Sequence, residues 1–329
     1  MICLNEDSPE VITAIQAIQA ASELCQKVSR ELPSMGALQK SDRSPVTVAD
    51  FGSQAIICRI IRERFPGDPI VAEEDSEALR DPKNSRALDL VTLYVKESLT
   101  EATSEKVCSW IDYSSQTPDA RFWTLDPIDG TKGFLRGDQY AIALALIEKG
   151  EVRLGLLGCP NLYSWGRPTG TQKGCLFLAL KGKGAVQTNM KGEERTVLSV
   201  SNVADPSGAN FAESFEPDHA DHLAHLRLAK KLNITAPSLR MDSQAKYGLV
   251  ARGEAALYLR IPSPDDPAYR EKIWDHAAGS IIAEEAGGKV TDLKGQALDF
   301  LHGIRMERNV GILVSNRILH EVVLKTLEF

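Results

Sequence analysis

Apolar residues recur every three or four positions in two stretches near the start of the chain, which is the period of an amphipathic α-helix. The first stretch covers residues 11–28 and follows Ser8 and Pro9, two residue types that favour a helix N-terminus. The second covers residues 48–65 and ends before a Pro-Gly pair. The polar segment 38–45 between them ends in a proline and predicts a mobile loop.

Shorter apolar runs bounded by turn residues predict β-strands. Lys149 and Gly150 separate two of these runs and indicate a hairpin. Helical patterns fill residues 76–118, and a last helix is expected from Asn316. The predicted strands are residues 69–72, 121–125, 141–148, 151–157, 175–180 and 310–314.

The order of these elements predicts a layered α/β fold, because helices alternate with strands and hairpins along the chain. Residues 202–208 are polar and contain a proline and a glycine, so they are the best candidate for a boundary. We therefore expect subdomains at residues 1–205 and 206–329 that join in one compact catalytic unit. A chain of 329 residues is long enough for this arrangement.

The composition is that of an ordinary globular protein, with 43% hydrophobic and 25% charged residues. The net charge is −7, which argues against nucleic-acid polymers or an anionic membrane as the main partner. An acidic protein that handles anionic substrates needs local positive charge, and metal ions can supply it. The sequence shows no basic-then-apolar leader and no run of about 18 apolar residues, so we expect a cytoplasmic protein.

The cysteines predict buried free thiols in a reducing compartment. None of them forms a CxxC pair, and no histidine stands at the spacing that a zinc site needs. The cysteines are Cys3, Cys25, Cys58, Cys108, Cys159 and Cys175.

Acidic residues stand at the ends of predicted strands and at the starts of predicted helices. Glu73 follows one short strand, and Asp126 and Asp129 lie where another strand turns. Asp275 opens an apolar helix, and Asp50 lies near the start of its own helix. Each has a structural explanation when it is taken alone, because Asp275 could cap its helix and the aspartates of the turn could build an Asx turn.

Taken together, these carboxylates predict a magnesium centre. Mg²⁺ prefers oxygen ligands, and two ions about 3.5–4 Å apart can share carboxylates and clamp both oxygens of a phosphoryl displacement. Without cations the mutual repulsion of the carboxylates would be costly. Thr131 follows at a helix start, where its hydroxyl can orient a water and the backbone N–H groups can receive a phosphate oxygen. The expected ligands are Glu73, Asp126, Asp129, Asp275 and the carbonyl of Ile128.

Three segments of the chain resemble the inositol monophosphatase superfamily. They are Val71–Glu74, Trp123–Phe134 and Trp274–Gly279, and the resemblance extends over nearly the whole chain. It implies an αβαβα sandwich of the inositol monophosphatase and fructose-1,6-bisphosphatase type. It also implies a phosphomonoesterase that uses about two or three Mg²⁺ ions per active site and is inhibited by lithium and sodium.

Further segments resemble the bisphosphate nucleotidase branch of this superfamily: Lys132–Phe134, Met241–Tyr247, Ala256–Pro262 and Glu271–His276. The resemblance implies hydrolysis of the 3'-phosphate of adenosine 3',5'-bisphosphate to give AMP, an activity of sulfur metabolism, with action on the sulfated form as well. Residues 1–205 would hold the metals, and residues 206–329 would complete the nucleotide site.

The resemblance also assigns roles to single residues. Asp50 and Thr131 would activate the attacking water. Lys246 and Arg260 carry the clearest physical logic, because a substrate with two phosphates needs a second anion site beyond the metals. The residues assigned to magnesium are Glu73, Asp126, Ile128, Asp129 and Asp275, and those assigned to the substrate are Thr131, His219, Ser243, Lys246, Arg260 and Asp275.

Two alternatives to this interpretation stay open at the level of sequence. An inositol polyphosphate 1-phosphatase or an inositol monophosphatase could use the same scaffold. A non-catalytic protein that only binds nucleotide phosphates is disfavoured, because every expected metal carboxylate is present together with Thr131. We expect a monomer that acts on a small nucleotide, and we expect no nucleic-acid or membrane partner.

Overall fold

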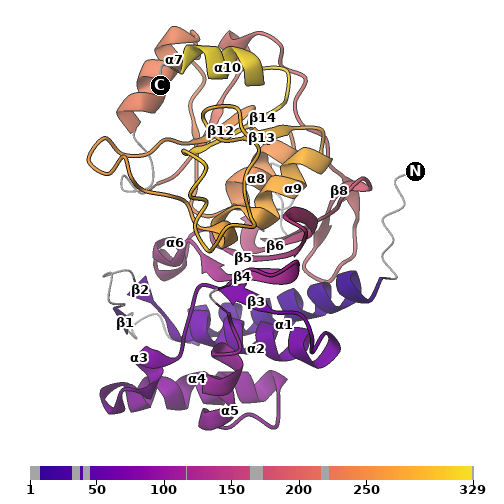
Figure 1. Cartoon of the computed structure of the whole chain (residues 1–329), viewed down its shortest axis with the longest axis vertical. Helices are drawn as coiled ribbons and strands as arrows, with labels where there is room; N and C mark the ends of the chain where they lie inside the picture. Colours follow the sequence, from indigo (N-terminus) through magenta and orange to yellow (C-terminus); the bar gives the residue numbers. More distant parts are fainter. Residues whose placement is uncertain are drawn as a thin grey trace.

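The computed structural model describes residues 8–31, 38–39, 45–115, 117–163, 173–215 and 222–327. In Figure 1 the described chain stacks helices, a seven-stranded sheet, a second helical layer, a five-stranded sheet and a last pair of helices. This order of layers confirms the predicted layered α/β sandwich.

The elements have the following bounds. The helices are α1 (Pro9–Glu31), α2 (Val48–Arg64), α3 (Glu77–Arg80), α4 (Ser85–Ser98), α5 (Ser104–Ile111), α6 (Thr131–Arg136), α7 (His222–Lys231), α8 (Ala245–Ala251), α9 (Ala277–Glu285) and α10 (His320–Thr326). The strands are β1 (Leu38–Gln39), β2 (Pro45–Val46), β3 (Ile70–Ala72), β4 (Arg121–Asp129), β5 (Ala141–Glu148), β6 (Glu151–Tyr163), β7 (Lys173–Leu180), β8 (Gly184–Asn189), β9 (Thr196–Val197), β10 (Phe211–Glu213), β11 (Leu239–Arg240), β12 (Leu257–Arg260), β13 (Lys289–Thr291) and β14 (Ile312–Ser315).

The first helical layer consists of α1 and α2, which pack against each other and against the large sheet. The hydroxyl of Ser8 accepts a hydrogen bond from the N–H of Val11 at 3.2 Å, so the predicted N-terminal cap of α1 is present. The buried residues of α1 follow the three-to-four spacing of its apolar stripe, which faces the sheet and α2.

The large sheet has the order β3-β4-β5-β6-β7-β8-β9, and every pair of neighbours is antiparallel except β3 with β4. Strand β5 shows why helices can cover both faces. Leu144 and Leu146 face the α1 and α2 side, whereas Ala143 and Ala145 face α9. A Cβ atom added at Gly155 of β6 would lie 2.4 Å from Ile281 of α9, so small residues let this helix approach closely.

The second sheet has the order β11-β10-β12-β14-β13 and lies beyond α8 and α9. Helix α9 is buried along most of its length because it is enclosed between the two sheets. The outer face of the second sheet packs under α7 and α10 (Figure 1). Thus α9 receives its position from both sheets, and the segment that leads into it lies between them.

Several boundaries differ from the sequence prediction. Part of the predicted loop 38–45 is ordered as strand, because Leu38 and Gln39 pair with β2 in a short antiparallel ladder. The last helix begins at His320 and not at Asn316. The side chain of Asn316 accepts the N–H of Leu319 at 3.1 Å and donates to the carbonyl of Val203 at 2.7 Å, so this residue forms the turn before the helix.

The chain passes from the large sheet to the second sheet between Val197 and Phe211. The predicted subdomain boundary after residue 205 falls inside this stretch, and we keep it as a proposal. In the described part of the chain, no helix combines the length and apolar character that a membrane span would need.

Five of the predicted buried thiols are confirmed. They carry no disulfide and are buried, and burial raises the pKa of Cys175 to about 11. Cys3 lies outside the described residues. The buried thiols are Cys25, Cys58, Cys108, Cys159 and Cys175.

A buried histidine outside the carboxylate region forms a polar network between β13, β14 and α10. His320 Nε2 lies 2.9 Å from the hydroxyl of Thr291, and its Nδ1 lies 2.8 Å from the hydroxyl of Ser315. Because Thr291 donates its own proton to the carbonyl of Asp292, it accepts one from Nε2, and Ser315 can donate to Nδ1. Burial and then the charge of Lys289 lower the pKa of His320 from 6.5 to about 4.

We therefore predict that His320 makes folding stability depend on pH in the window from 6.5 down to about 4. In that window the histidine of the unfolded chain binds a proton, whereas His320 in the folded protein stays neutral. The contribution of His320 to the free energy of unfolding is therefore fully present above pH 6.5 and falls as the pH falls towards 4. The His320→Gln variant should be less stable at pH 7, and its deficit should shrink towards pH 5. Urea unfolding at matched pH values measures this difference, and parallel curves for the two proteins would contradict it.

Candidate active site

The end of β4 carries the central acidic segment. The β4–β5 register shifts between Asp126 and Asp129, so the predicted turn is a bulge in a strand that continues to residue 129. The carboxylate of Asp126 is buried and accepts the N–H of Ile128 at 3.1 Å. Gly130 follows with φ of 86°, and a Cβ atom there would lie 3.2 Å from the Cβ of Ser243. Glycine therefore allows the chain to turn into α6 against the second half of the molecule.

Thr131 and Asp50 are brought together as predicted. The hydroxyl oxygen of Thr131 lies 3.3 Å from Asp50 Oδ1 and 3.2 Å from the carbonyl oxygen of Ile128. The other carboxylate oxygen of Asp50 accepts the N–H and the hydroxyl of Thr47, at 2.7 and 2.5 Å, in the capping box of α2. The helix cap thus fixes one oxygen of Asp50 and aims the other at Thr131.

Glu73 follows β3, and its N–H donates to the carbonyl of Leu125 at 3.2 Å, so the pairing with β4 continues to this residue. A buried side chain of α2 supports the next residue. Gln54 donates to the carbonyl of Glu74 at 2.6 Å and accepts the N–H of Glu74 at 3.0 Å. Helix α2 therefore positions both Asp50 and the segment that carries Glu73.

Asp275 closes a short 3-10 turn, Ile273–Asp275, directly before α9. The N-cap of α9 is His276, so Asp275 is not the helix cap that it could have been on sequence grounds alone. Burial, followed by the charges of Asp129 and Glu73, raises the pKa of Asp275 well above its ordinary value. Carboxylates from three distant parts of the chain therefore interact here.

Asp129 connects the two halves of the site. Its Oδ2 accepts the backbone N–H of Gln244 at 2.6 Å. The side chain of Gln244 donates to the carbonyl of Trp274 at 2.9 Å and accepts the N–H of Gly279 at 3.1 Å. Burial raises the pKa of Asp129, and the charge of Lys246 opposes this shift. One glutamine thus holds both the Asp129 carboxylate and the segment that contains Asp275.

The chemistry of these donors suits a hard divalent cation, because ionised carboxylates and a backbone carbonyl are the ligands that Mg²⁺ prefers. Burial is the main cause of the raised pKa of Asp275, the charges of Asp129 and Glu73 raise it further, and a bound cation would oppose both effects. The residues that could hold such ions are Glu73, Asp126, Asp129, Asp275 and Ile128 through its carbonyl.

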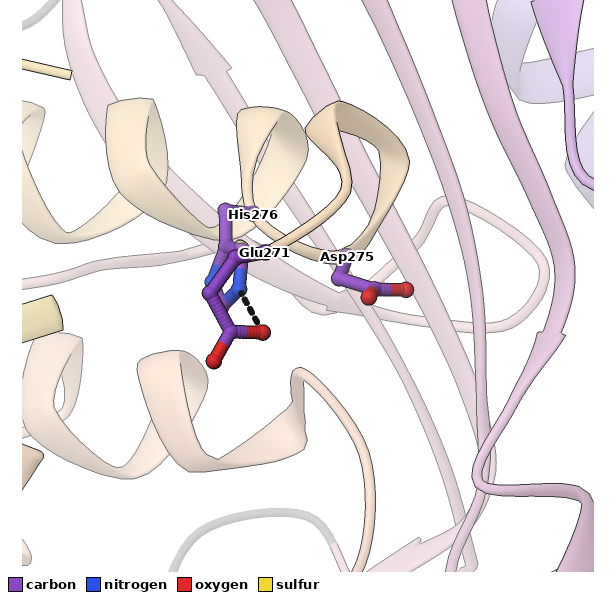
Figure 2. Close-up of side chains that lie close together, drawn as sticks. All are labelled: Glu271, Asp275 and His276. Carbon is purple, nitrogen blue, oxygen red and sulfur yellow. Dashed lines mark hydrogen bonds and ion pairs between the residues drawn. The ribbon is translucent and has the colours of Figure 1, made fainter. Parts of the chain in front are cut away.

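Figure 2 shows a tighter group of potential ligands around Asp275, in which Glu271 and His276 lie beside it. The ligand atoms of these three residues all lie within 4.8 Å of one another. Glu271, however, forms a bidentate ion pair with Arg260, at 3.1 and 2.9 Å. Its charge is already compensated, so Asp275 is the member of this group that remains suited to a metal.

Two cationic residues lie next to the carboxylates. Lys246 of α8 is 2% exposed, and its ammonium donates to the carbonyl of Met241 at 3.3 Å above the ring of Tyr258. Burial lowers the pKa of Lys246 to about 8, although the charge of Asp129 opposes this shift. Arg260 ends β12 and stands close enough to Lys246 to lower that pKa further. The structure therefore pairs a region of negative charge with a region of positive charge.

The structure describes one of the two remaining predicted substrate residues, Ser243 and His219. Ser243 is in the left-handed region with φ of 72°, and its hydroxyl accepts the N–H of Ala245 at 3.2 Å. Its neighbour Asp242 forms an ion pair with Arg136, which agrees with a structural role. His219 lies outside the described residues, so its role stays a prediction.

Three residues around the site were not assigned a role from the sequence. They are Gln54, Gln244 and Glu271. Gln54 could have been noticed, because it interrupts the apolar side of an otherwise amphipathic helix. Gln244 and Glu271 stand inside the segments that carry the family resemblance, but nothing in their spacing shows that their partners are Asp129 and Arg260.

Comparison with known proteins gives matches over almost the whole chain. The family described as the inositol monophosphatase family matches residues 7–329. A rice (Oryza sativa) protein named 3'(2'),5'-bisphosphate nucleotidase is 43% identical over 342 residues, covering 98% of this chain and 95% of that protein. A protein of the same name from Dictyostelium discoideum is 42% identical over 324 residues, covering 96% of this chain and 95% of that protein.

Solved structures share the fold at lower identity. An inositol monophosphatase (IMPase) from Thermotoga maritima has a TM-score of 0.66 at 22% identity, covering 97% of this chain and 96% of that chain. The extragenic suppressor protein suhB from Bartonella henselae has a TM-score of 0.68 at 20% identity, covering 98% of this chain and 99% of that chain. These likenesses confirm the predicted αβαβα sandwich of this family.

Proposed function

Because this chain belongs to the inositol monophosphatase family, we propose that it is a phosphatase that removes the 3'-phosphate of adenosine 3',5'-bisphosphate to give AMP and phosphate. Its relatives from rice and Dictyostelium carry the name of this activity and align over nearly its full length. We extend the proposal to the sulfated form of the same nucleotide, whose 3'-phosphate is chemically equivalent.

The enzyme would need a metal, as is general in this family, and we propose that the metal is Mg²⁺. Its ligands would be the carboxylates of Glu73, Asp126, Asp129 and Asp275 with the carbonyl of Ile128. When bound, such ions would lower the pKa of a water molecule and neutralise the charge of the phosphate. About two or three ions per site is the count we propose.

The role of the chain's own residues follows from the hydrogen bonds of Thr131. The hydroxyl of Thr131 would donate to Asp50 Oδ1, and its oxygen would accept a hydrogen bond from the attacking water and so orient that water. Asp50 cannot turn away, because its other oxygen is held by Thr47. We propose that the two residues act as one unit that aims the water at phosphorus.

The observation that carries the choice of substrate is the cationic pair beside Asp129. Lys246 and Arg260 would receive a second phosphate at a distance from the metals. A monophosphate substrate would bring no second phosphate to Lys246 and to the N–H groups of Arg260 that Glu271 does not bind, whereas a 3',5'-bisphosphate fills both sites. We further propose that Ser243 and His219 contact the nucleoside.

A phosphate-release panel tests this function. We expect adenosine 3',5'-bisphosphate to have the highest kcat/KM in magnesium buffer, AMP to be the product, and activity to vanish with EDTA. The panel should include inositol 1,4-bisphosphate and inositol 1-phosphate, which represent the rival phosphatase activities. A higher kcat/KM for either inositol phosphate would overturn the substrate, and binding without release in magnesium would overturn catalysis. The monomeric state and the cytoplasmic location stay predictions.

A further inference from the structure

We propose that Glu271 is a positioning residue, which holds the guanidinium of Arg260 in place and thereby creates the preference for substrates with two phosphates. This inference rests on the proposed function, because it concerns how the second phosphate is bound. It adds a residue to the site that would contact neither the substrate nor a metal.

The first support is the geometry of the ion pair. Arg260 Nε donates to one oxygen of Glu271 at 3.1 Å, and Nη2 donates to the other at 2.9 Å. This fork fixes the plane of the guanidinium, while the N–H groups that take no part in the pair remain for a phosphate. The side chain of Arg260 is 13% exposed, so it is partly accessible, whereas that of Glu271 is 6% exposed.

The second support is that Glu271 is itself held from the other side. His276 Nε2 lies 3.1 Å from Glu271 Oε2, and His276 Nδ1 lies 2.8 Å from the hydroxyl of Tyr247 (Figure 2 shows the first contact). Since a carboxylate only accepts hydrogen bonds, Nε2 donates to Glu271 and the Tyr247 hydroxyl donates to Nδ1. The chain of bonds from Tyr247 to Arg260 is therefore continuous and has a defined direction.

The backbone adds a third constraint. The carbonyl of Glu271 accepts the N–H of Met306 at 2.9 Å, and the next strand-like contact joins Lys272 with Arg305. Glu271 thus reaches Arg260 from a segment whose main chain is bound to residues 305–306, in the connection between β13 and β14. Both the side chain and the main chain of Glu271 are fixed before any ligand arrives, which is the property of a residue that orients another.

The rival role for Glu271 is metal binding, because it lies in the group with Asp275 and His276. Three charged or polar N–H donors already occupy its two oxygens. Burial alone would raise the pKa of Glu271, but the charge of Arg260 and the bond from His276 hold that pKa well below its ordinary value. A carboxylate whose charge is already compensated by Arg260 and by the N–H of His276 is a poor ligand for a further cation.

The test compares two substrates in wild type and in the Glu271→Gln variant. The amide would turn an N–H group towards Arg260, so the guanidinium should lose its orientation. We expect kcat/KM for adenosine 3',5'-bisphosphate to fall at least about thirtyfold, mainly through KM, and kcat/KM for adenosine 3'-monophosphate to change less than about threefold. An equal loss on both substrates would overturn the proposal, because it would show a general structural role.

Two controls separate the positioning role from its alternatives. The double variant Arg260→Met/Glu271→Gln should lose no more selectivity than Arg260→Met alone, since Glu271 acts only through Arg260. The magnesium concentration for half-maximal activity should be unchanged in Glu271→Gln, and a rise of about tenfold or more would identify a metal ligand instead. Glu271→Asp keeps the charge, so it should recover part of the selectivity, and it provides the same comparison if the amide variant fails to fold.

The outcome for the proposed function is read separately. If wild type does not turn over the bisphosphate, the proposed function fails, whatever the variants do. If wild type prefers the bisphosphate and Glu271→Gln keeps that preference, only the inference about Glu271 fails.

Discussion

Replacement of Asp129 with asparagine is expected to lower kcat about a thousandfold without unfolding the protein. The amide removes one negative charge from the predicted metal centre, but its oxygen can still accept the N–H of Gln244 that Asp129 now accepts at 2.6 Å. The contact between the two halves of the site is therefore preserved, while the affinity for the cation is not. Steady-state kinetics over a range of magnesium concentrations measures the loss.

Thermal unfolding gives the same variant a second signature. Burial raises the pKa of Asp275 and the charge of Asp129 raises it further, so the removal of this charge should relieve repulsion when no divalent ion is present. We expect Asp129→Asn to be at least as stable as wild type in EDTA and to gain less stability when magnesium is added. A variant with wild-type turnover, or one with an undiminished response to magnesium, would show that Asp129 is not a ligand.

Asp75 offers a matched control. It lies two residues after Glu73 but is exposed, and its carboxylate accepts the N–H of Glu77 at 2.9 Å. Asp75→Asn makes the same chemical change a short distance from the site. It should leave both turnover and the response to magnesium unaltered.

The layers of the fold were predictable because each leaves a periodic trace in the sequence. The alternation of leucine with alanine in β5 predicts a strand. In the structure the leucines face α1 and α2, whereas the small alanines face α9 and let that helix approach the sheet closely. The parts that failed are local. The last helix was expected to start at Asn316, but the structure places this residue in the turn before the helix. Its side chain donates there to the carbonyl of Val203, more than a hundred residues away in the chain, and the local sequence does not indicate this partner.

The individual site residues were predictable to a different degree. Acidic residues after strands and before helices indicate where a metal centre can form, and Asp50 and Thr131 are indeed neighbours. The sequence could not show which side chains bind one another inside the site. Arg260 looked like a guanidinium that meets only a phosphate, whereas the structure shows that a buried carboxylate already binds two of its N–H groups.

The supporting glutamines show the same limit. Gln244 has no special spacing, and a neutral amide gives no charge pattern that would draw attention, whereas Gln54 is marked only by its place on the apolar side of α2. Their importance comes from burial, because a buried amide must find partners for both its donor and its acceptor. Gln244 finds them on the segment around Asp275, which makes it a link between distant parts of the site.

Replacement of Thr131 with valine should lower kcat by about a hundredfold to a thousandfold, while KM for the nucleotide changes little. Valine has nearly the same shape and the same branching at Cβ, so α6 should start as before, but it has no hydroxyl to relay a proton to Asp50. Thr131→Ser retains the hydroxyl and should keep kcat within about tenfold of wild type. Kinetics of the three proteins at saturating magnesium measures both effects.

The structure makes this comparison specific to the hydroxyl. When Thr131 loses its oxygen, Asp50 still has the two bonds from Thr47 that fix its other carboxylate oxygen. The carboxylate should therefore stay in place, and the loss of rate can be assigned to the missing proton relay and not to a displaced aspartate. If valine supported wild-type turnover, the water would have to be oriented without Thr131, and the pairing of this residue with Asp50 would be only a helix-start contact.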